Sequence, residues 1–301
     1  MFKQTTYSIN SYEVLSVRNL KGVGIDIIPQ KGGAIHQLYL GENGTPILNP
    51  FIKGTDIKSN PWYKQALLFP FPNRLNNGTY VHNDIEYHFP INETDRNNAL
   101  HGFLNKETLE VSEVNCKENE VEVKLTYEYN GHYPHYPFPC KLSITYLVAE
   151  NTFQLSFQIE NTGSTSLPYG FGWHPYFLFE HQAEISMPTT YRQIVDKRLL
   201  PTGEEVLYND LTTYKTLHTS LDTCFRFIDN PTVKIGNSNS YQLEIRSTQS
   251  MDYMQIFNPE PNLIAVEPVT CNIDAFNTKK GLTNLMPNEY GIHQCEVLFI
   301  C

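Results

Sequence analysis

The segment from residue 120 to residue 160 alternates apolar and polar side chains, and this alternation constrains the fold more than any other feature of the sequence. Apolar residues occupy every second position in 121–129, 142–148 and 153–159. A period of two places such residues on one face of a β-strand. Glu150-Asn151 is typical of a turn, so the last two runs are predicted to form an antiparallel pair with one buried face and one solvated face.

Further short apolar runs extend this pattern along the chain, at 23–28, 241–245 and 296–300. Long runs with helical periodicity are hard to find, and 17 glycines and 19 prolines interrupt the sequence at many points, which favours many short strands. No linker-like segment or repeat divides the 301 residues. We therefore predict an all-β fold, one large antiparallel β-sandwich domain over residues 1–301 with a few short helices.

The charge balance limits the partners of the chain. It has 22 Lys and Arg residues against 32 Asp and Glu residues, a formal net charge of −10. Nucleic-acid binding needs clustered basic residues, so we expect no nucleic-acid partner. No apolar segment is long enough for a membrane span and the first residues show no signal-peptide pattern, so we expect no membrane association and a cytoplasmic location. The six cysteines contain no CxxC pair and are expected to be free thiols: Cys116, Cys140, Cys224, Cys271, Cys295 and Cys301.

Four ionisable residues lie among prolines, glycines and aromatic residues rather than in plain alternating strands. They are Arg74 in FPFPNRLNNGTY, His101 in NNALHGF, His174 in PYGFGWHPYF and Glu267 in LIAVEPVTCNIDAFN. Singly, each has a structural explanation: an arginine is more often an ion-pair partner, and a histidine before glycine is more often a turn residue or a hydrogen-bonded core group. They indicate a shared site only if the fold brings them together. In a β protein, the spacing of residues along the sequence does not show whether it does.

Glu267 gives the sharpest of these signals. The apolar run 263–266 is expected to be a buried strand that leads directly into this carboxylate and that Pro268 then ends. A buried carboxylate is unfavourable unless it is paired or used, and desolvation raises its pKa towards the range of a general base. A buried ion pair is the alternative explanation for Glu267.

His174 lies between a tryptophan and a proline. With Trp173 and Tyr176 nearby, an aromatic-walled pocket could use His174 as a proton donor, and a hydrogen-bonded core histidine is the alternative.

A second histidine cluster is interpreted as a loop. His132, His135 and Cys140 lie close together in GHYPHYPFPC, but this stretch is rich in proline and no second cluster with zinc-like spacing accompanies it. The sequence also lacks GxxxxGK[ST], GxGxxG and GxSxG motifs. We therefore predict no metal site and no cofactor.

Five short motifs, in this order, resemble those of the aldose 1-epimerase (mutarotase) family. They are NRL at 73–75, LHGF at 100–103, WHPYF at 173–177, LDTCF at 221–225 and EPVTCNIDAFN at 267–277. The resemblance spans about residues 20–300. It implies the large antiparallel β-sandwich of that family and a small-molecule sugar as substrate.

The resemblance also implies a role for each matched residue. Glu267 would be the base on the C1 hydroxyl, and protonated His174, kept charged by a nearby carboxylate, would be the acid at the ring oxygen. His101 would bind at or near the ring oxygen, and Arg74 and Asp222 would hold other hydroxyls. Mutarotation of a free aldohexose needs no metal, nucleotide or redox cofactor.

The motifs depart from the family pattern in three places, one of which is Pro268-Val269-Thr270 after the glutamate. The best-studied galactose mutarotases carry a second glycine where this chain has Phe103, and an Asn-His pair where it has Trp173-His174. The chain is therefore interpreted as a divergent branch whose sugar is not fixed, with Trp173, Tyr176 or Phe103 as candidates to stack on that sugar. Two alternatives stay open, a hexose 6-phosphate epimerase, which would need basic residues at the pocket mouth, and a non-catalytic carbohydrate-binding protein.

Overall fold

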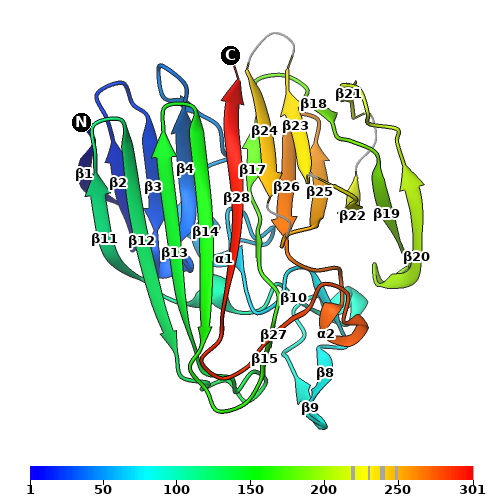
Figure 1. Ribbon diagram of the computed structural model, residues 1–301. Coiled ribbons are helices and arrows are strands. Elements are labelled where there is room, and N and C mark those ends of the chain that lie inside the picture. Colours follow the sequence, from blue (N-terminus) through cyan, green and yellow to red (C-terminus); the bar gives the residue numbers. More distant parts are fainter. Residues whose placement is uncertain (218–220, 230, 238–240, 248–249, 301) are drawn as a thin grey trace.

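The structure is a computed structural model that describes residues 1–300 apart from 218–220, 230, 238–240 and 248–249. Three antiparallel sheets make up most of it (Figure 1). The nine-stranded sheet has the order β11-β12-β13-β14-β28-β24-β23-β18-β21. Its strands are β11 (Glu110–Cys116), β12 (Glu120–Tyr129), β13 (Cys140–Ala149), β14 (Thr152–Asn161), β18 (Glu184–Ser186), β21 (Lys215–Thr216), β23 (Thr232–Gly236), β24 (Gln242–Ser247) and β28 (Tyr290–Ile300).

The nine-stranded sheet contains the alternating segment. Residues of β12, β13 and β14 alternate between buried and partly exposed along most of their length. β13 and β14 pair antiparallel from Cys140–Asn161 to Ala149–Thr152, with Glu150-Asn151 as the turn between them. The predicted hairpin is therefore confirmed, and its apolar face forms one wall of the core.

The other two large sheets pack against this wall. The five-stranded sheet has the order β1 (Lys3–Ile9), β2 (Tyr12–Arg18), β3 (Gly24–Ile28), β4 (Ala34–Leu40) and β5 (Thr45–Pro46). The eight-stranded sheet contains β20 (Pro201–Tyr208), β19 (Thr190–Val195), β22 (Asp222–Phe227), β25 (Tyr253–Glu260), β26 (Leu263–Val269), β16 (Gly172–Trp173) and β6 (Leu67–Leu68), and β17 (Tyr176–Leu178) also pairs with β26. Because β3 contacts β13 and β26 contacts β24, each of these sheets covers a different part of the nine-stranded sheet (Figure 1). The layered antiparallel arrangement confirms the predicted β-sandwich.

The remaining elements are short. Three two-stranded sheets are formed by β7 (Arg74–Asn76) with β10 (Asn98–Leu100), β8 (Thr79–His82) with β9 (Ile85–His88), and β15 (Leu167–Tyr169) with β27 (Thr283–Leu285). The helices are α1 (Gly54–Ser59), α2 (Ala275–Thr278) and the 3₁₀ turns η1 (Pro29–Lys31), η2 (Thr94–Arg96) and η3 (Leu104–Lys106). This confirms the expected few short helices. No helix in the described ranges combines the length and the hydropathy that a membrane crossing requires.

β26 is buried along its whole length, and the expectation that Pro268 ends it is wrong. The strand continues to Val269, which pairs with Tyr253 of β25 on one side and with Gly172 of β16 on the other. The N–H of Thr270 donates to Phe171 O on the β16 side, and alternate residues of an antiparallel strand direct this group to the same side. The nitrogen of Pro268 therefore faces the part of β26 that lies between its pairing with β16 and its pairing with β17. The missing N–H of proline removes no strand-to-strand hydrogen bond there.

Candidate functional site

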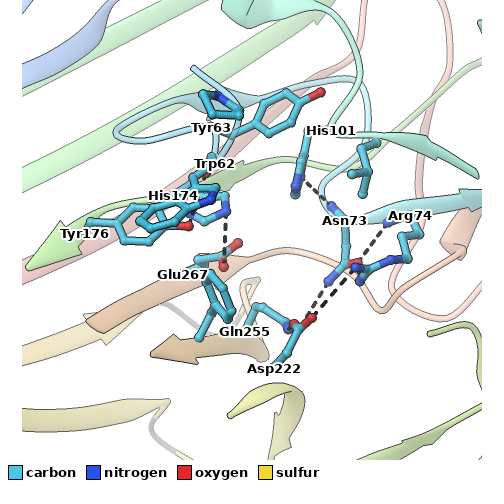
Figure 2. A pocket seen from close by; sticks show the side chains of 13 residues that line it. Trp62, Tyr63, Asn73, Arg74, His101, His174, Tyr176, Asp222, Gln255 and Glu267 are labelled. Carbon is cyan, nitrogen blue, oxygen red and sulfur yellow. Dashed lines mark hydrogen bonds and ion pairs between the residues drawn. The ribbon is translucent and has the colours of Figure 1, made fainter. Parts of the chain in front are cut away.

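All five predicted site residues line a single pocket against the middle strands of the eight-stranded sheet. Arg74, His101, His174, Asp222 and Glu267 lie around it in Figure 2. The other lining residues are Pro61, Trp62, Tyr63, Asn73, Leu100, Tyr176, Gln255 and Phe257. The structure therefore brings together the residues that sequence spacing alone did not connect.

The eight-stranded sheet supplies the floor of this pocket. Glu267 lies inside β26, and Gln255 is its register partner on β25. Asp222 is the first residue of β22, which pairs with the other side of β25. His174 lies between β16 and β17, both of which pair with β26. Neighbouring strands therefore fix the acidic and imidazole groups relative to one another.

A short β-ribbon supplies the rest of the pocket. Arg74 is the first residue of β7 and pairs with Leu100, the last residue of β10, so His101 follows directly. Asn73 and His101 both have left-handed backbone conformations, with φ of 59° and 63°. These two turns place Arg74 and His101 beside the sheet, facing Glu267 (Figure 2).

Glu267 and His174 form a buried pair. The distance from His174 Nε2 to Glu267 Oε1 is 3.4 Å, and the two residues are only 5% and 2% exposed. Desolvation raises the pKa of Glu267 well above its usual value, and the charge of Asp222 adds to this effect. Desolvation lowers the pKa of His174 to about 3. Burial therefore opposes the charged form of each group, a carboxylate at Glu267 and an imidazolium at His174.

This result corrects the expectation that a nearby carboxylate keeps His174 charged. The carboxyl group of Glu267 lies beside it, but desolvation by burial lowers the pKa of His174 and so opposes the charged ring. The ring of Tyr176 stacks on His174 with centroids 5.0 Å apart and an interplanar angle of 10°, which contributes to that exclusion of water.

His101 is held as a neutral hydrogen-bond donor. The backbone N–H of Asn73 donates to Nδ1 of His101 at 3.0 Å, so this nitrogen carries no proton and Nε2 carries it. Burial, together with the neighbouring His174 and Arg74, lowers the pKa of His101 well below its usual value. The His101 ring lies edge-on to that of His174, with centroids 5.4 Å apart.

Arg74 is anchored by Glu93, a residue that the sequence analysis missed. Nε of Arg74 lies 3.0 Å from one carboxylate oxygen of Glu93, and Nη2 donates to the other at 3.1 Å. Burial opposes ionisation of Glu93, but hydrogen bonds from Arg74 and Asn98 lower its pKa. Nη2 of Arg74 also lies 3.7 Å from Asp222. In sequence, Glu93 belongs to a polar stretch with no apolar pattern around it, so no signal distinguished it.

For the sugar substrate that the family resemblance implies, replacing Glu93 by Gln is expected to raise KM about 10-fold with little change in kcat, the equivalent of one charge-assisted hydrogen bond of about 1.5 kcal/mol. The amide cannot hold the guanidinium through two charged contacts, so Arg74 loses its fixed orientation. Steady-state rates across a sugar concentration series measure the effect. Glu86→Gln, which removes an exposed carboxylate paired with His88, is the control. A fall in kcat as large as the rise in KM, or no change in either parameter, would contradict the positioning role of Glu93.

Asn73 and Gln255 connect the two sides of the pocket and were also missed. Nδ2 of Asn73 donates to Oε1 of Gln255 at 3.0 Å, and Nε2 of Gln255 donates to Asp222 at 2.5 Å. Gln255 had a detectable signal, because it is a polar residue within the apolar run 253–257. The reasoning applied to Glu267 applies equally to this glutamine.

Two of the three aromatic residues expected to stack on a sugar point into the core instead. Trp173 is fully buried against Phe153, and Phe103 is buried against Phe69 and Tyr129. Tyr176 does line the pocket. The other aromatic walls come from Trp62, Tyr63 and Phe257, none of which the sequence analysis selected.

The basic residues near the pocket are divided between two cavities. Arg74 is the only Lys or Arg in the described lining of the pocket itself. A neighbouring cavity shares Pro61, Tyr63 and Leu100 with it. Its lining also includes Lys31, Lys58, Arg96 and Lys106.

The His132–Cys140 segment is a connection between β12 and β13. The exposed His132 contacts Asn130 and packs on Tyr133, whereas Cys140 is buried in the first position of β13. Within the described residues, no three His, Cys, Asp or Glu side chains form a group able to hold a metal ion. The five described cysteines are free thiols, as expected, and Cys301 lies outside the described residues.

Comparisons with known proteins identify relatives of this chain in sequence and in fold. The Escherichia coli K12 protein YihR, itself uncharacterized, is 26% identical over 224 residues, which cover 70% of this chain and 71% of YihR. A galactose mutarotase-like protein from Clostridium acetobutylicum superposes with a TM-score of 0.88 at 20% identity, covering 99% of this chain and 98% of that one. Galactose 1-epimerase from Lactobacillus acidophilus NCFM superposes with a TM-score of 0.82 at 15% identity, covering 99% and 98%. At such identities, the superpositions show a shared fold.

The family assignment rests on the sequence itself. The sequence model described as aldose 1-epimerase matches residues 13–296, which include every residue assigned above to the pocket. With the five motifs converging on one pocket, this match shows that the chain belongs to the aldose 1-epimerase family.

Proposed function

We propose that this protein is an aldose 1-epimerase, which interconverts the α and β anomers of an aldohexose by general acid/base ring opening and reclosure. The observation that carries the proposal is the Glu267–His174 pair, 3.4 Å apart and buried in a pocket with both polar and aromatic walls. Proton removal at one hemiacetal oxygen and proton delivery to the other require two such groups close together.

The reaction begins with Glu267 and His174 sharing one proton. As the sugar fills the pocket, its hydroxyls hydrogen-bond the carboxylate, and the proton passes across the 3.4 Å gap to His174. Glu267 then accepts the proton of the C1 hydroxyl while His174 gives its proton to the ring oxygen. The bond between C1 and the ring oxygen breaks, and C1 becomes an aldehyde. Each proton transfer contributes about 10²- to 10⁴-fold to the rate.

Reclosure reverses these steps on the opposite face of C1. Rotation about the C1–C2 bond presents the other face of the aldehyde to the hydroxyl that had been the ring oxygen. His174 takes the proton of that hydroxyl, and Glu267 returns a proton to the new C1 oxygen. The conversion has no net redox change and needs no cofactor.

The other predicted residues bind the sugar in this proposal. Nε2–H of His101 donates to the ring oxygen or a hydroxyl next to it, because its tautomer leaves this N–H free for the pocket. Arg74 and Asp222 hold further hydroxyls through charge-assisted hydrogen bonds. Tyr176 and the aromatic residues at 62 and 63 offer flat faces to the apolar side of the ring.

The wild-type protein is expected to accelerate the approach to anomeric equilibrium of freshly dissolved α-D-glucose or α-D-galactose. Polarimetry measures the rate, with heat-denatured protein as the control. A carbohydrate-binding protein without turnover would bind the sugars in calorimetry yet leave the polarimetric rate at the buffer value, and that outcome would contradict the proposal. Which hexose is preferred, and the cytoplasmic location, stay predictions.

A further inference from the structure

Among the described residues, none forms a hydrogen bond with the second ring nitrogen of His174. Nε2 faces Glu267 Oε1 at 3.4 Å, whereas Nδ1 is buried without a partner (Figure 2). A histidine that transfers protons is usually oriented by a group bonded to its other nitrogen. The direction of this ring therefore depends on the backbone of residue 174 and on the ring of Tyr176, which stacks on it.

The backbone of His174 is held from the β6 side of the sheet. β16 lies between β26 and β6 in the strand order. The N–H of His174 donates to Ala66 O at 3.0 Å, and the N–H of Gln65 donates to His174 O at 2.9 Å. Both polar backbone groups of His174 are thus bonded to the two residues that precede β6.

The side chain of Gln65 extends this pairing to Tyr176. Its Oε1 accepts the N–H of Tyr176 at 3.2 Å, and its Nε2 donates to Tyr176 O at 3.4 Å. Nε2 also donates to Asn49 O at 3.0 Å, and Gln65 is 0% exposed. One buried side-chain amide therefore takes the place of the peptide group that a neighbouring strand would offer to Tyr176.

The backbone conformation of Gln65 indicates that its side chain has a role. Its φ is 60°, in the left-handed region that glycine and asparagine adopt more readily. Tyr63 is also left-handed, with φ of 52°, and the N–H of Ala66 donates to Tyr63 O at 3.1 Å, which closes a tight turn before β6. The backbone of this turn does not favour a glutamine, so the amide bonds to Tyr176 are what the glutamine contributes.

We propose that Gln65 is a positioning residue for the acid of the epimerase reaction, and that it directs the His174 ring towards Glu267 by holding both ends of segment 174–176. The inference rests on the proposed function and adds the residue that orients its acid. The backbone N–H of Gln65 fixes residue 174, and its amide fixes Tyr176, whose ring covers one face of the imidazole. Gln65 is not among the described lining residues of the pocket, so it acts through His174 rather than on the sugar.

Gln65→Met is expected to lower kcat about 10- to 100-fold with little change in KM. Methionine has a similar length but no amide, so segment 174–176 is freed at Tyr176. A misplacement of about 1 Å in a reacting group costs up to about 100-fold in rate. Arg74 and Asp222, which hold the sugar hydroxyls in the proposed function, are not bonded to Gln65. Steady-state polarimetry with the sugar that the wild type prefers measures both parameters.

Gln37→Met is the matched control, because Gln37 makes the same kind of bonds in another sheet. Gln37 lies on β4 and is 4% exposed, its Oε1 accepts the N–H of Leu48 at 2.8 Å, and its Nε2 donates to Leu48 O at 2.9 Å. Loss of these bonds is expected to lower the free energy of unfolding about as much as Gln65→Met does, while kcat stays near the wild-type value. Urea titrations compare the two stabilities. Equal falls in kcat in the two variants would overturn the positioning role.

Gln65→Asn separates positioning from folding, and it decides the matter if Gln65→Met does not fold. Asparagine suits the left-handed backbone at residue 65, but its amide is one carbon shorter and does not reach both backbone groups of Tyr176. The free energy of unfolding is expected to fall less than in Gln65→Met, while kcat still falls. A wild-type kcat in this variant would overturn the proposal.

Nitrogen NMR of the His174 ring gives a readout that does not depend on turnover. In the wild type, burial lowers the pKa of His174 to about 3, so its ring signals are expected not to titrate between pH 5 and pH 8. In Gln65→Met, a displaced ring gains contact with water, and its pKa is expected to move towards the usual value of about 6.5. Glu267, His101 and Tyr176, the titratable groups that face this ring, are the same in both proteins.

The ring signals also keep this proposal separate from the proposed function. Unchanged signals in Gln65→Met, or the same change in Gln37→Met, would overturn the role of Gln65. If the wild type turns over no sugar, the epimerase proposal fails, and the signals of His174 still show whether Gln65 holds its ring in place.

Discussion

Glu267→Gln is expected to lower kcat/KM for anomer interconversion by about 10²- to 10⁴-fold, because the amide cannot accept the proton of the C1 hydroxyl. The change keeps the size of the side chain in a fully buried strand, so the loss reflects chemistry rather than packing. Polarimetry on the sugar that the wild type prefers measures it. Glu244→Gln is the control, because Glu244 is also buried in a strand but contacts Lys234 and Arg246 away from the pocket. A Glu267→Gln protein with near-wild-type rates would remove Glu267 from the mechanism.

The same substitution is expected to stabilise the fold, increasingly so at higher pH. The folded-state pKa of Glu267 is raised above its unfolded value. The favourable contribution of the protonated carboxyl is therefore complete below the unfolded pKa, about 4.3, and is lost as pH rises through the folded pKa. Glutamine does not titrate, so the difference in the free energy of unfolding should widen between pH 5 and pH 8. Urea titrations at both pH values measure it, and a difference that does not grow with pH would contradict the raised pKa.

His174→Gln is expected to reduce kcat by about 10²- to 10⁴-fold with a smaller change in KM, because no other group replaces the acid at the ring oxygen. Steady-state kinetics of the variant separate the two parameters. His36→Gln is the control, because His36 is a buried histidine that packs on Phe51 in another sheet. A rise in KM at unchanged kcat would show that His174 only binds the sugar.

His174→Gln also has an expected signature in stability. The pKa of His174 is lowered from 6.5 to about 3 in the folded chain. The contribution of the neutral ring to the free energy of unfolding is therefore fully present above the unfolded pKa of 6.5. It is lost as pH falls from 6.5 towards the folded pKa of about 3. The wild type should lose stability between pH 7 and pH 5 more steeply than the glutamine variant. Parallel slopes in urea titrations over this range would show that His174 is charged in the folded state.

Much of the fold followed from local pattern. The alternation at 121–129, 142–148 and 153–159 defined a buried face, and the hairpin turn at Glu150-Asn151 fixed the pairing of two strands. The order of strands in each sheet did not follow, because β28 pairs with β14 although 128 residues lie between the end of β14 and the start of β28. Such long-range pairing depends on packing across the core, which no local pattern encodes.

The candidate site shows the same division between local and long-range information. The residues with family motifs could be selected from the sequence, but Glu93 could not, because its importance comes only from reaching Arg74 across a ribbon. The inward orientation of Trp173 could have been predicted from the sequence, but the sequence analysis placed this ring in the pocket. Neighbouring residues of an extended chain point to opposite sides, so a His174 that faces the pocket directs Trp173 into the core.

The bond from the backbone of Asn73 to Nδ1 of His101 has a consequence for how this protein can evolve. A side-chain donor at that place would be lost by a single substitution, whereas a main-chain amide remains in any replacement that keeps the left-handed turn at this position, such as glycine or aspartate. The tautomer of His101 thus depends on the backbone and not on the side chains that select the sugar. A lineage can therefore exchange Asn73, Gln255 or the aromatic wall, and acquire a new sugar, without altering where that proton resides.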